Sequence, residues 1–542
     1  MSVVLPVQYQ PPLPAAMIRR DQPSPEAIEL DVLIVGAGPA GLACAIELHR
    51  QSPDLTIGVL EKAGSLGEHT LSGAVINPVA IRALFPECKD EDFPFRQRVD
   101  HEAVYYLTRN GSTKVPTPPT MQNRGYYSAS LCEVVRWMGE QAETRGINLF
   151  PGFPAESLFV DGERVIGVRT VPSGLDRAGE PTDVFQEPTD LMAKVVVLAE
   201  GSRGGLAQAW RSWRGVGSAN PQIFALGVKE VWQVKQPLDR IIHTLGWPLP
   251  AGAFGGSWCY PMGPDQVSIG LVVGLDYHDA TLDVHESLQR MKLHPLFRPI
   301  LEGGQLLEWG AKTIPEGGFY SLPERLSGDG LVMVGDTVGF VDVPSLKGVH
   351  YAMESGMLAA KAIAAALANA GTGDAAALSA YDRAVHESRI TSDLRRTRNI
   401  RLAFRDGFAV GAMKAGLMTL TGGAFPGGRI AMPKDADVPR SSHPLAEPFV
   451  PDNVLTFSKV DAVFKSGNAT RDSIPSHLVV GEQVPGDVAD FYAHLCPAGV
   501  YERQGDTLVV NPPNCIDCKA TDVLGPRWTP REGGSGPKYR LM

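Results

Sequence analysis

Long apolar runs, cysteines and an excess of basic charge are all scarce in this 542-residue sequence. No run of eighteen uncharged apolar residues occurs, which argues against a membrane-spanning helix. The formal net charge of −10 leaves no surplus of Lys and Arg to bind phosphates, so we expect no nucleic-acid partner. Seven scattered cysteines are too few for a secreted disulfide scaffold and indicate a reducing compartment. The length is sufficient for two or three globular domains.

The first thirty residues also lack the features of a targeting segment. They are rich in proline and carry Arg19 and Arg20 among scattered acids. They show neither the charged-then-apolar order of a secretory signal nor the Arg and Ser richness of a transit peptide. We expect residues 1–28 to form an extended or disordered arm.

The strongest pattern in the chain is a strand, a glycine-rich turn, a helix and a second strand between residues 31 and 61. The apolar run Asp31–Val35 precedes the turn, and a second apolar run, Thr56–Leu60, ends in Glu61, twenty residues after Gly41. This complete spacing is typical of a dinucleotide-binding βαβ unit, whereas a glycine motif alone is a weak signal. The turn residues are Gly36, Ala37, Gly38, Pro39, Ala40 and Gly41.

Each glycine of this turn has a separate physical role. Gly36 permits the tight turn, Gly38 lets the backbone approach a pyrophosphate, and Gly41 lets the helix pack closely on the strand. The pyrophosphate then lies at the helix N-terminus, where unpaired N–H groups favour anions. We expect Glu61 to accept a hydrogen bond from the adenosine ribose.

Later strands predict a second contact to the same cofactor. The apolar runs Lys194–Ala199 and Leu331–Val334 are typical of buried parallel strands, whose carboxyl ends bind ligands in open α/β sheets. Asp336, after Gly335, is placed to bind a ribityl chain, and a helix that begins after Gly348 would direct its positive end at the flavin. These features favour FAD. Lys62, His69 and Thr70 follow the second strand and are further candidates for contact with the cofactor.

The remaining chain divides by composition. Residues 221–325 are rich in Trp, Gly and alternating strands such as Val267–Val273, and predict an inserted antiparallel domain. Residues 407–428 carry one charge, Lys414, and many glycines, which suits shallow insertion into a membrane surface or an internal helix that covers the flavin. Val115–Tyr127 is a second candidate for membrane contact.

Three of the cysteines gather in the last fifty residues. Cys515 and Cys518 have the spacing of cluster ligands, and Cys496 lies nineteen residues upstream of Cys515. Iron–sulfur clusters are usually held by four thiolates. A zinc knuckle that uses His477 or His494, and a redox CxxC pair, are the alternatives.

Several long strings in the chain resemble one family, the electron-transfer flavoprotein:ubiquinone oxidoreductases. The similarity begins near residue 30 and extends over nearly all of the remaining chain. The strings cover residues 67–73, 246–249, 255–257, 270–277, 316–319, 343–348, 496–501 and 532–537.

This resemblance implies a mixed α/β and α+β fold with three interwoven parts. They are a Rossmann-like FAD-binding domain, an inserted antiparallel quinone-binding domain and a C-terminal ferredoxin-like iron–sulfur domain. We assign them to residues 29–220 with 326–404, to 221–325 and to 431–542, with a membrane-contacting segment at 405–430. The resemblance also implies that a quinone contacts Gly255 and Gly256, whose paired glycines leave a flat backbone surface.

At one position the chain departs from the family's pattern. The third cysteine of the family's tail motif is replaced here by Thr521. Three hypotheses remain. An oxygen ligand from Thr521 or Asp522 completes a 4Fe–4S cluster, the cluster becomes a three-iron form, or the site is empty. An oxygen ligand binds such iron less strongly than a thiolate does.

The resemblance implies that electrons pass from reduced electron-transfer flavoprotein, through FAD and the cluster, to ubiquinone. It also implies peripheral attachment to a membrane, which we expect to be the cytoplasmic side of a bacterial inner membrane, or the matrix face of the mitochondrial inner membrane in a eukaryote. The relay needs no nucleophile or triad. The alternatives are an FAD-dependent prenyl-chain reductase, an aromatic-ring monooxygenase and a non-catalytic FAD membrane adaptor.

Overall fold

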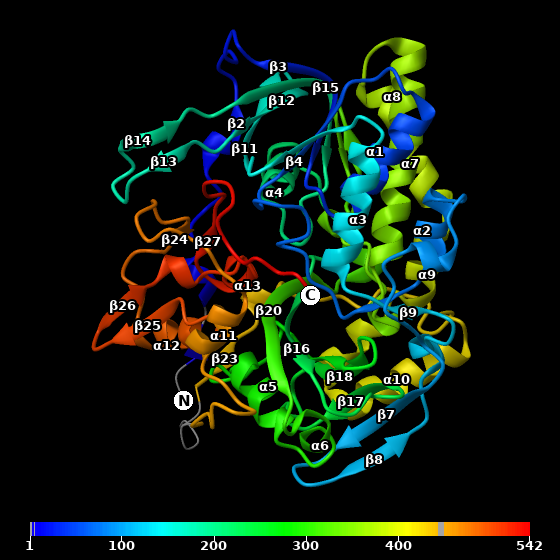
Figure 1. Ribbon diagram of the computed structural model, residues 1–542, viewed down its shortest axis with the longest axis vertical. Coiled ribbons are helices and arrows are strands. Elements are labelled where there is room, and N and C mark those ends of the chain that lie inside the picture. The colour runs from blue at the N-terminus through cyan, green and yellow to red at the C-terminus, as the bar shows by residue number, and fades with distance from the viewer. Residues whose placement is uncertain (1–2, 5, 443–448) are drawn as a thin grey trace.

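The computed structural model describes residues 3–4, 6–442 and 449–542 (Figure 1). Residues 1, 2 and 5 of the predicted arm and residues 443–448 of the predicted iron–sulfur domain lie outside the described part. In Figure 1 the C-terminal segment, in orange and red, lies on the opposite side of the molecule from helices α7 and α8. The fold is of the mixed α/β type that the sequence predicts.

A nine-stranded sheet carries the predicted dinucleotide-binding turn. Its strands β3 (Ile28–Val35), β4 (Ile57–Glu61) and β15 (Asp190–Leu198) are parallel neighbours and are almost wholly buried where they are apolar. The other strands are β10 (Asn148–Pro151), β12 (Arg164–Thr170), β11 (Ala155–Asp161), β2 (Ile18–Arg19), β21 (Ser327–Gly328) and β22 (Leu331–Met333). The main path runs β10-β4-β3-β15-β12-β11-β2, and β22 pairs with β15.

Helices cover this sheet and pack closely on one another. Helix α1 (Pro39–Gln51) packs along the long helix α7 (Val349–Ala370), with α3 (Leu131–Glu143) beside α1 (Figure 1). A Cβ at Gly356 would lie 2.2 Å from the carbonyl oxygen of Ala40, so the two long helices touch backbone to backbone. The other helices in this part are α2 (Val79–Leu84), α4 (Gly205–Trp213), α8 (Ala375–Glu387) and α9 (Arg389–Thr397).

A seven-stranded sheet forms the second part. Its order is β20 (Gln305–Pro315), β16 (Phe224–Gln233), β19 (Gln266–Gly274), β18 (Gly255–Pro261), β17 (Ile241–Gly246), β7 (Glu102–Leu107) and β8 (Ser112–Val115). All neighbours are antiparallel except β17 and β7. Strands β7 and β8 thus extend this sheet from outside the predicted 221–325 boundaries. Helices α5 (Val284–Lys292) and α6 (Arg298–Leu301) also belong to this part.

The C-terminal segment shares an apolar core with the seven-stranded sheet. Buried Trp309 and Leu271 of the sheet belong to the same cluster as Leu495 and Leu524. The segment contains helices α11 (Lys459–Lys465), α12 (Gly486–Leu495) and α13 (Ala520–Leu524) and the hairpin β25 (Tyr501–Gln504) and β26 (Thr507–Val510). A second strand pair joins β24 (Leu478–Val479) and β27 (Arg527–Trp528).

Short strand pairs complete the fold. They are β1 (Val3–Val4) with β23 (Arg440–Ser441), β13 (Ser173–Leu175) with β14 (Pro181–Gln186), and β9 (Tyr127–Ser128) with β5 (Val75–Ile76) and β6 (Gln97–Arg98). The N-terminal arm is attached to the fold, because Gln10 donates hydrogen bonds to the carbonyl oxygens of Asp522 (2.9 Å) and Gly525 (3.2 Å).

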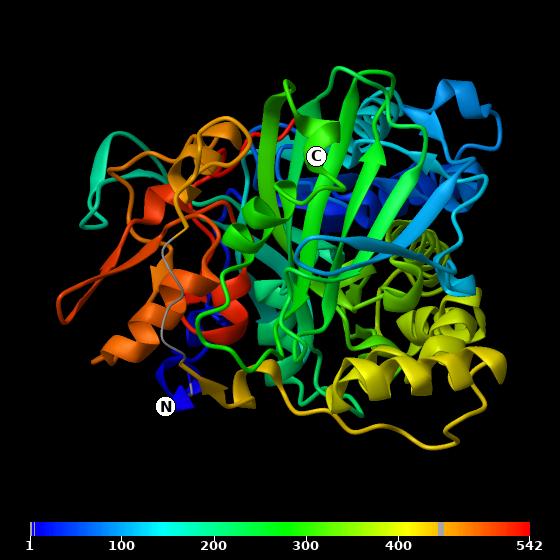
Figure 2. The ribbon, with the colours of Figure 1, turned by 90° about the horizontal axis from the view of Figure 1, so that it is seen from below.

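Helix α10 (Phe408–Leu420) lies at the rim of the molecule, drawn in yellow in Figure 2. Its sequence contains one charged residue, Lys414. Within the described ranges, none of the helices combines the length and the apolar character that crossing a bilayer requires.

Candidate functional site

A cavity of about 880 Å³ lies between the two sheets and the C-terminal segment. Its size is within the range of cofactor sites. Most of the residues predicted from the sequence line it together, although they come from distant parts of the chain. They are Gly36, Gly38, Pro39, Ala40, Glu61, Lys62, His69, Thr70, Gly255, Gly256, Asp336 and Gly348. Ala37, Gly41 and Gly335 are not in the lining and lie next to it in sequence.

The glycines of the βαβ turn have the geometry that a bound pyrophosphate needs. Gly36 has a φ of +109°, and a Cβ there would lie 2.4 Å from the carbonyl oxygen of Ala199. A Cβ at Gly41 would lie 2.0 Å from the carbonyl oxygen of Gly36. No atom lies within 4 Å of a Cβ built at Gly38, so this position leaves open space at the N-terminus of α1. The turn therefore fits a dinucleotide such as FAD.

Glu61 stabilises the turn as well as lining the cavity. Its two carboxylate oxygens accept hydrogen bonds from the backbone N–H groups of Ala37 (3.1 Å) and Ala63 (2.9 Å). These bonds fix the carboxylate at the end of β4. The remaining lone pairs stay available to a ribose hydroxyl.

The second predicted contact lies across the cavity. Gly335 adopts a φ of +65°, and its N–H donates to Ser355 Oγ (2.9 Å), which directs the chain so that Asp336 lines the cavity. Burial raises the pKa of Asp336 to about 6, although Lys312 nearby acts in the opposite direction. Gly348 is the N-cap of α7, so the positive end of this long helix also faces the cavity.

The predicted quinone glycines lie at the start of β18. A Cβ at Gly255 would lie 2.2 Å from the carbonyl oxygen of Val272, and one at Gly256 would lie 2.6 Å from that of Thr244. Close packing of the neighbouring strands therefore requires glycine at both positions. Their backbone is left as a bare surface on the cavity wall.

A charged cluster connects the cavity to the cysteine loop. Asp517, between Cys515 and Cys518, forms an ion pair with Lys62 Nζ at 2.5 Å and accepts from Arg531 and from Trp528 Nε1, each at 2.9 Å. These neighbours outweigh burial and hold the pKa of Asp517 well below its usual value. Lys62 directly follows strand β4, so this ion pair holds the end of β4 to the C-terminal segment.

His69 belongs to the same cluster. Its Nδ1 lies 2.6 Å from Lys62 Nζ. Burial and the charge of Lys62 lower the pKa of His69 well below its ordinary value, so the imidazole is neutral. This arrangement indicates that His69 forms a structural hydrogen bond and does not favour proton donation by its ring.

The three C-terminal cysteines are buried in one region. Cys496 follows α12, Cys515 and Cys518 lie in the loop before α13, and Thr521 lies in α13 with 8% of its surface exposed. Burial raises the pKa of each thiol, and the charges of Cys496 and Cys515 add to this effect at Cys518. The three cysteines therefore lie in one buried region of the C-terminal segment. His494 lies beside Asp283 instead (4.0 Å).

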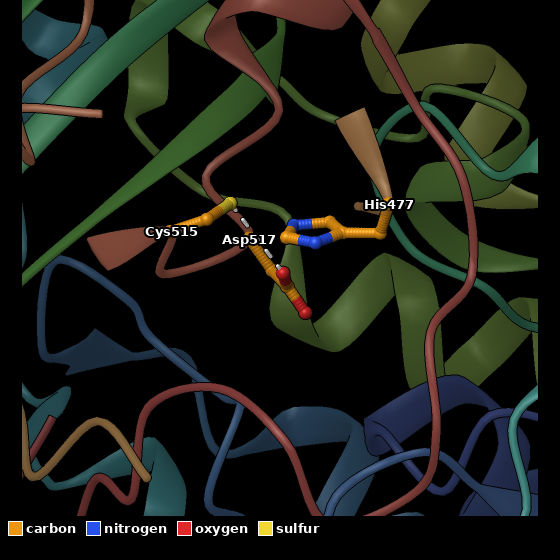
Figure 3. Close-up of side chains that lie close together, drawn as sticks. All are labelled: His477, Cys515 and Asp517. Atoms are coloured by element: carbon orange, nitrogen blue, oxygen red, sulfur yellow. Dashed lines mark hydrogen bonds between the residues drawn. The ribbon is translucent and has the colours of Figure 1, made fainter. Parts of the chain in front are cut away.

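A separate set of possible ligands, His477, Cys515 and Asp517, has its ligand atoms within 4.8 Å of one another. Figure 3 shows the imidazole ring of His477 directed towards the other two side chains. The Asp517 carboxylate already forms ion pairs with two positively charged side chains, those of Lys62 and Arg531. A dication here would meet strong repulsion, so this set does not form a favourable mononuclear site.

Several cavity residues carry no sequence signal. Lys312 and Thr313 on β20 line the cavity, as do Lys519 and Trp528 of the C-terminal segment. The Thr313 N–H donates to the Cys518 carbonyl oxygen (3.0 Å), and Lys312 Nζ donates to the Asp517 carbonyl oxygen (3.3 Å). These residues line the cavity because the cysteine loop lies against β20, and the sequence alone does not show this contact.

Solved structures share the fold of this chain. A geranylgeranyl bacteriochlorophyll reductase-like protein from Thermoplasma acidophilum superposes with a TM-score of 0.58 at 18% identity, over 74% of this chain and 96% of that chain. A flavin-dependent brominase superposes with a TM-score of 0.51 at 18% identity, over 73% and 94%. At this identity the likeness concerns the fold.

Family models and curated relatives are more specific. Residues 224–314 match the model "ETF-QO, ubiquinone-binding", residues 453–540 match "Electron transfer flavoprotein-ubiquinone oxidoreductase, 4Fe-4S", and residues 15–85 match the Thi4 family. The mitochondrial electron transfer flavoprotein-ubiquinone oxidoreductase of Arabidopsis thaliana is 37% identical over 95% of this chain and 85% of its own length. The human protein of the same name is 35% identical over 95% and 90%. The chain belongs to the electron transfer flavoprotein-ubiquinone oxidoreductase family.

Proposed function

We propose that the chain transfers electrons from reduced electron-transfer flavoprotein, through FAD and an iron–sulfur cluster, to ubiquinone. The hydrogen bond from Thr313 to Cys518 is the observation that carries this proposal. Thr313 lines the large cavity, and Cys518 is a predicted cluster ligand. The two redox groups would therefore be separated by little more than one strand. The match of residues 453–540 to a 4Fe–4S model favours this function over prenyl-chain reduction.

Different residues of the cavity are assigned different roles. FAD, when bound, supplies storage for one or two electrons, and the cluster supplies storage for one. The turn at Gly36–Gly41 and the α1 N-terminus bind the pyrophosphate, and Asp336 accepts hydrogen bonds from the ribityl chain. The N-terminus of α7 at Gly348 stabilises negative charge on the flavin. Gly255 and Gly256 provide the surface for the quinone ring.

We propose Cys496, Cys515 and Cys518 as the cluster's thiolate ligands. Thr521 occupies the position at which the family's fourth thiolate is expected, and its side chain is buried. A neutral hydroxyl supplies a weaker ligand than a thiolate. The cluster is therefore expected to hold its fourth iron loosely.

Iron analysis of the Thr521→Cys variant tests this ligand set. We expect the variant to contain about four irons per FAD and to keep them in air, because a fourth thiolate completes the usual ligand set. The wild-type protein, purified without oxygen, is expected to lose iron on exposure to air and to show the EPR signal of an oxidised three-iron cluster. Equal iron retention by both proteins would contradict the role given to Thr521.

We propose that α10 and the loop after it contact the membrane surface. Exposed apolar side chains gather there, with 63% of Met413 and 85% of Leu420 accessible. Val410, Leu417 and Phe425 are exposed as well. Phe408 is half-buried and packs on the rings of Phe404 and Tyr106, so it is a poorer membrane anchor than the exposed residues of α10. Segment 115–127 contributes Pro118, Pro119, Thr120 and Met121 to the wall of the cavity.

Substituting Met413, Leu417 and Leu420 by serine is expected to lower partitioning onto lipid vesicles by at least about tenfold, since each buried apolar side chain contributes about 1.5–3 kcal/mol. Vesicle flotation measures the change. The matched control replaces Val454, Val460 and Phe464, which are exposed apolar residues of the C-terminal segment. Equal losses in the two triple variants would contradict a specific role for α10.

The proposed contact of α10 with a membrane bears on the location of the protein in the cell. The relatives are named as mitochondrial proteins. We propose peripheral attachment to an energy-conserving membrane, on the cytoplasmic side in a bacterium or the matrix face in a mitochondrion. The electron-transfer flavoprotein and ubiquinone named in the family are the proposed partners.

A further inference from the structure

A second cavity, of about 300 Å³, adjoins the large cavity. The two cavities share Lys347 and His350 in their walls, together with Asn77, Pro119, Thr120, Ile400 and Thr419. The smaller cavity is lined mainly by polar side chains, and its volume is enough for several water molecules. It therefore forms a polar annex to the proposed flavin and quinone site.

The annex contains acids that accept hydrogen bonds from hydroxyl groups. Tyr351 Oη donates to Asp393 Oδ2 (2.9 Å), and Asp393 is half-buried on α9. Thr397 Oγ1 donates to Asp342 Oδ1 (2.8 Å), and Asp342 is 4% exposed. Arg396, which is exposed, also lines this cavity. Ionisable groups thus extend from the protein surface to the interior.

The annex also contains buried polar groups with few hydrogen-bond partners. Lys347 is 8% exposed, and its Nζ donates to two backbone carbonyl oxygens, those of Ser345 (3.2 Å) and Leu346 (3.5 Å). His350 is 5% exposed and its Nδ1 has no hydrogen-bond partner among the described residues. Buried polar groups with unused bonding capacity indicate contact with water or a ligand.

Lys347 also lines the large cavity, together with Gly255 and Gly256, where the quinone is proposed to bind. Its positive charge acts on His243 of β17, which lines the large cavity. The neighbouring strand β18 begins with Gly255 and Gly256, and His243 lies opposite Trp258 of that strand. The unpartnered Nδ1 of His243 is buried in the same region. Lys347 therefore belongs to the walls of both the annex and the large cavity that contains the proposed quinone surface.

We propose that Lys347 donates protons to the quinone, and that the annex, entered at Asp393, supplies them from solvent. The inference rests on the proposed function. Quinone reduction takes up two electrons, which come from the reduced flavoprotein, and two protons, which form an O–H bond at each carbonyl oxygen. Each proton leaves the Lys347 ammonium group, and the neutral amine recovers a proton through water in the annex and the Asp393 carboxyl group.

The electrostatic setting agrees with this role. Burial lowers the pKa of Lys347 to about 8, while Glu102 and Asp342 partly oppose the shift. A donor with a pKa near the working pH can both give and recover a proton. Burial lowers the pKa of His243 and of His350 to about 3, so both rings are neutral, and their unpartnered Nδ1 atoms are available for hydrogen bonds to water.

The test compares two substitutions at Lys347 in the holoprotein, with reduced electron-transfer flavoprotein as donor and a short-chain ubiquinone as acceptor. We expect Lys347→Met and Lys347→Arg both to lower quinone turnover by at least about 100-fold, because neither side chain releases a proton near pH 7. Reduction of the bound flavin by the donor should stay at the wild-type rate. Wild-type turnover in Lys347→Arg would overturn the proposal, because positive charge alone would then suffice.

Asp393→Asn tests the entry to the annex independently. We expect turnover to fall about tenfold and to recover when formate is added, because a small weak acid replaces the lost carboxyl group as proton carrier. Glu387→Gln, the same change at an exposed position near the end of α8, is the control and should behave as wild type with and without formate. Lowered turnover that formate does not restore would contradict proton entry at Asp393.

Two outcomes separate this inference from the proposed function. A wild-type holoprotein that fails to reduce ubiquinone would overturn both. Wild-type turnover that persists in Lys347→Met and in Asp393→Asn would overturn the proton route alone. If both Lys347 variants lose flavin, the formate response of Asp393→Asn decides the question by itself.

Discussion

Gly41→Ala is expected to abolish flavin binding and, with it, all electron transfer. The new Cβ would lie 2.0 Å from the carbonyl oxygen of Gly36 and 3.2 Å from Ile34 Cγ2. Backbone and a buried strand surround this position, so α1 must move away from β3 for the methyl group to fit. We expect no flavin absorbance in the purified protein and a lower melting temperature.

Gly38→Ala is the informative comparison. The backbone at Gly38 is extended, with a φ of −79°, and a Cβ there meets no atom within 4 Å. The substitution should leave the melting temperature of the flavin-free protein unchanged and reduce flavin affinity at least about tenfold, because the methyl group takes the space proposed for the pyrophosphate. Gly252→Ala, in an exposed loop without close neighbours, should change neither quantity. Full flavin content in Gly38→Ala would contradict the proposed pyrophosphate position.

Glu230→Ala is expected to lower the free energy of unfolding by about 3–5 kcal/mol. The substitution leaves the residues that line the cavity unchanged. The Glu230 carboxylate is fully buried and accepts from Lys292 Nζ (2.8 and 2.9 Å), Gln289 Nε2 (2.9 Å) and Trp232 Nε1 (2.6 Å). Truncation leaves the buried ammonium group of Lys292 without its counter-charge. Denaturant unfolding measures the change.

Two controls distinguish the lost charge pair from a simple cavity. Glu230→Leu combined with Lys292→Met removes both charges and should be less destabilising than Glu230→Ala, because no buried charge is left unpaired. Glu302→Ala breaks an exposed pair with Arg298 and should cost less than about 1 kcal/mol. A double variant as unstable as Glu230→Ala would show that packing, and not the unpaired charge, dominates.

The sequence predicted the dinucleotide unit well because its signals are local. The strand, turn, helix and second strand that carry Gly36, Gly41 and Glu61 follow one another within about thirty residues, and each step has its own residue pattern. The helix predicted to begin after Gly348 corresponds to α7 (Val349–Ala370). Alternation likewise predicted β19 around Val267–Val273.

These local patterns did not predict which distant segments of the chain pack against one another. Strand β7 joins the seven-stranded sheet by parallel pairing of Glu102 with Ile241, and neither strand signals its partner. Lys312 and Lys519 enter the cavity only because the cysteine loop lies against β20. Phe408 lies in the low-charge segment that the sequence predicts to contact a membrane, but ring contacts with Phe404 and Tyr106 partly bury it.

An anaerobic titration of the purified holoprotein with reduced electron-transfer flavoprotein, followed by ubiquinone, tests the central claim most directly. Visible absorbance and low-temperature EPR report the flavin and the cluster in the same samples. We expect the flavoprotein to reduce both groups, and both to be reoxidised when ubiquinone is added. A cluster that stays oxidised during the titration, or reduced groups that ubiquinone leaves unchanged, would contradict it.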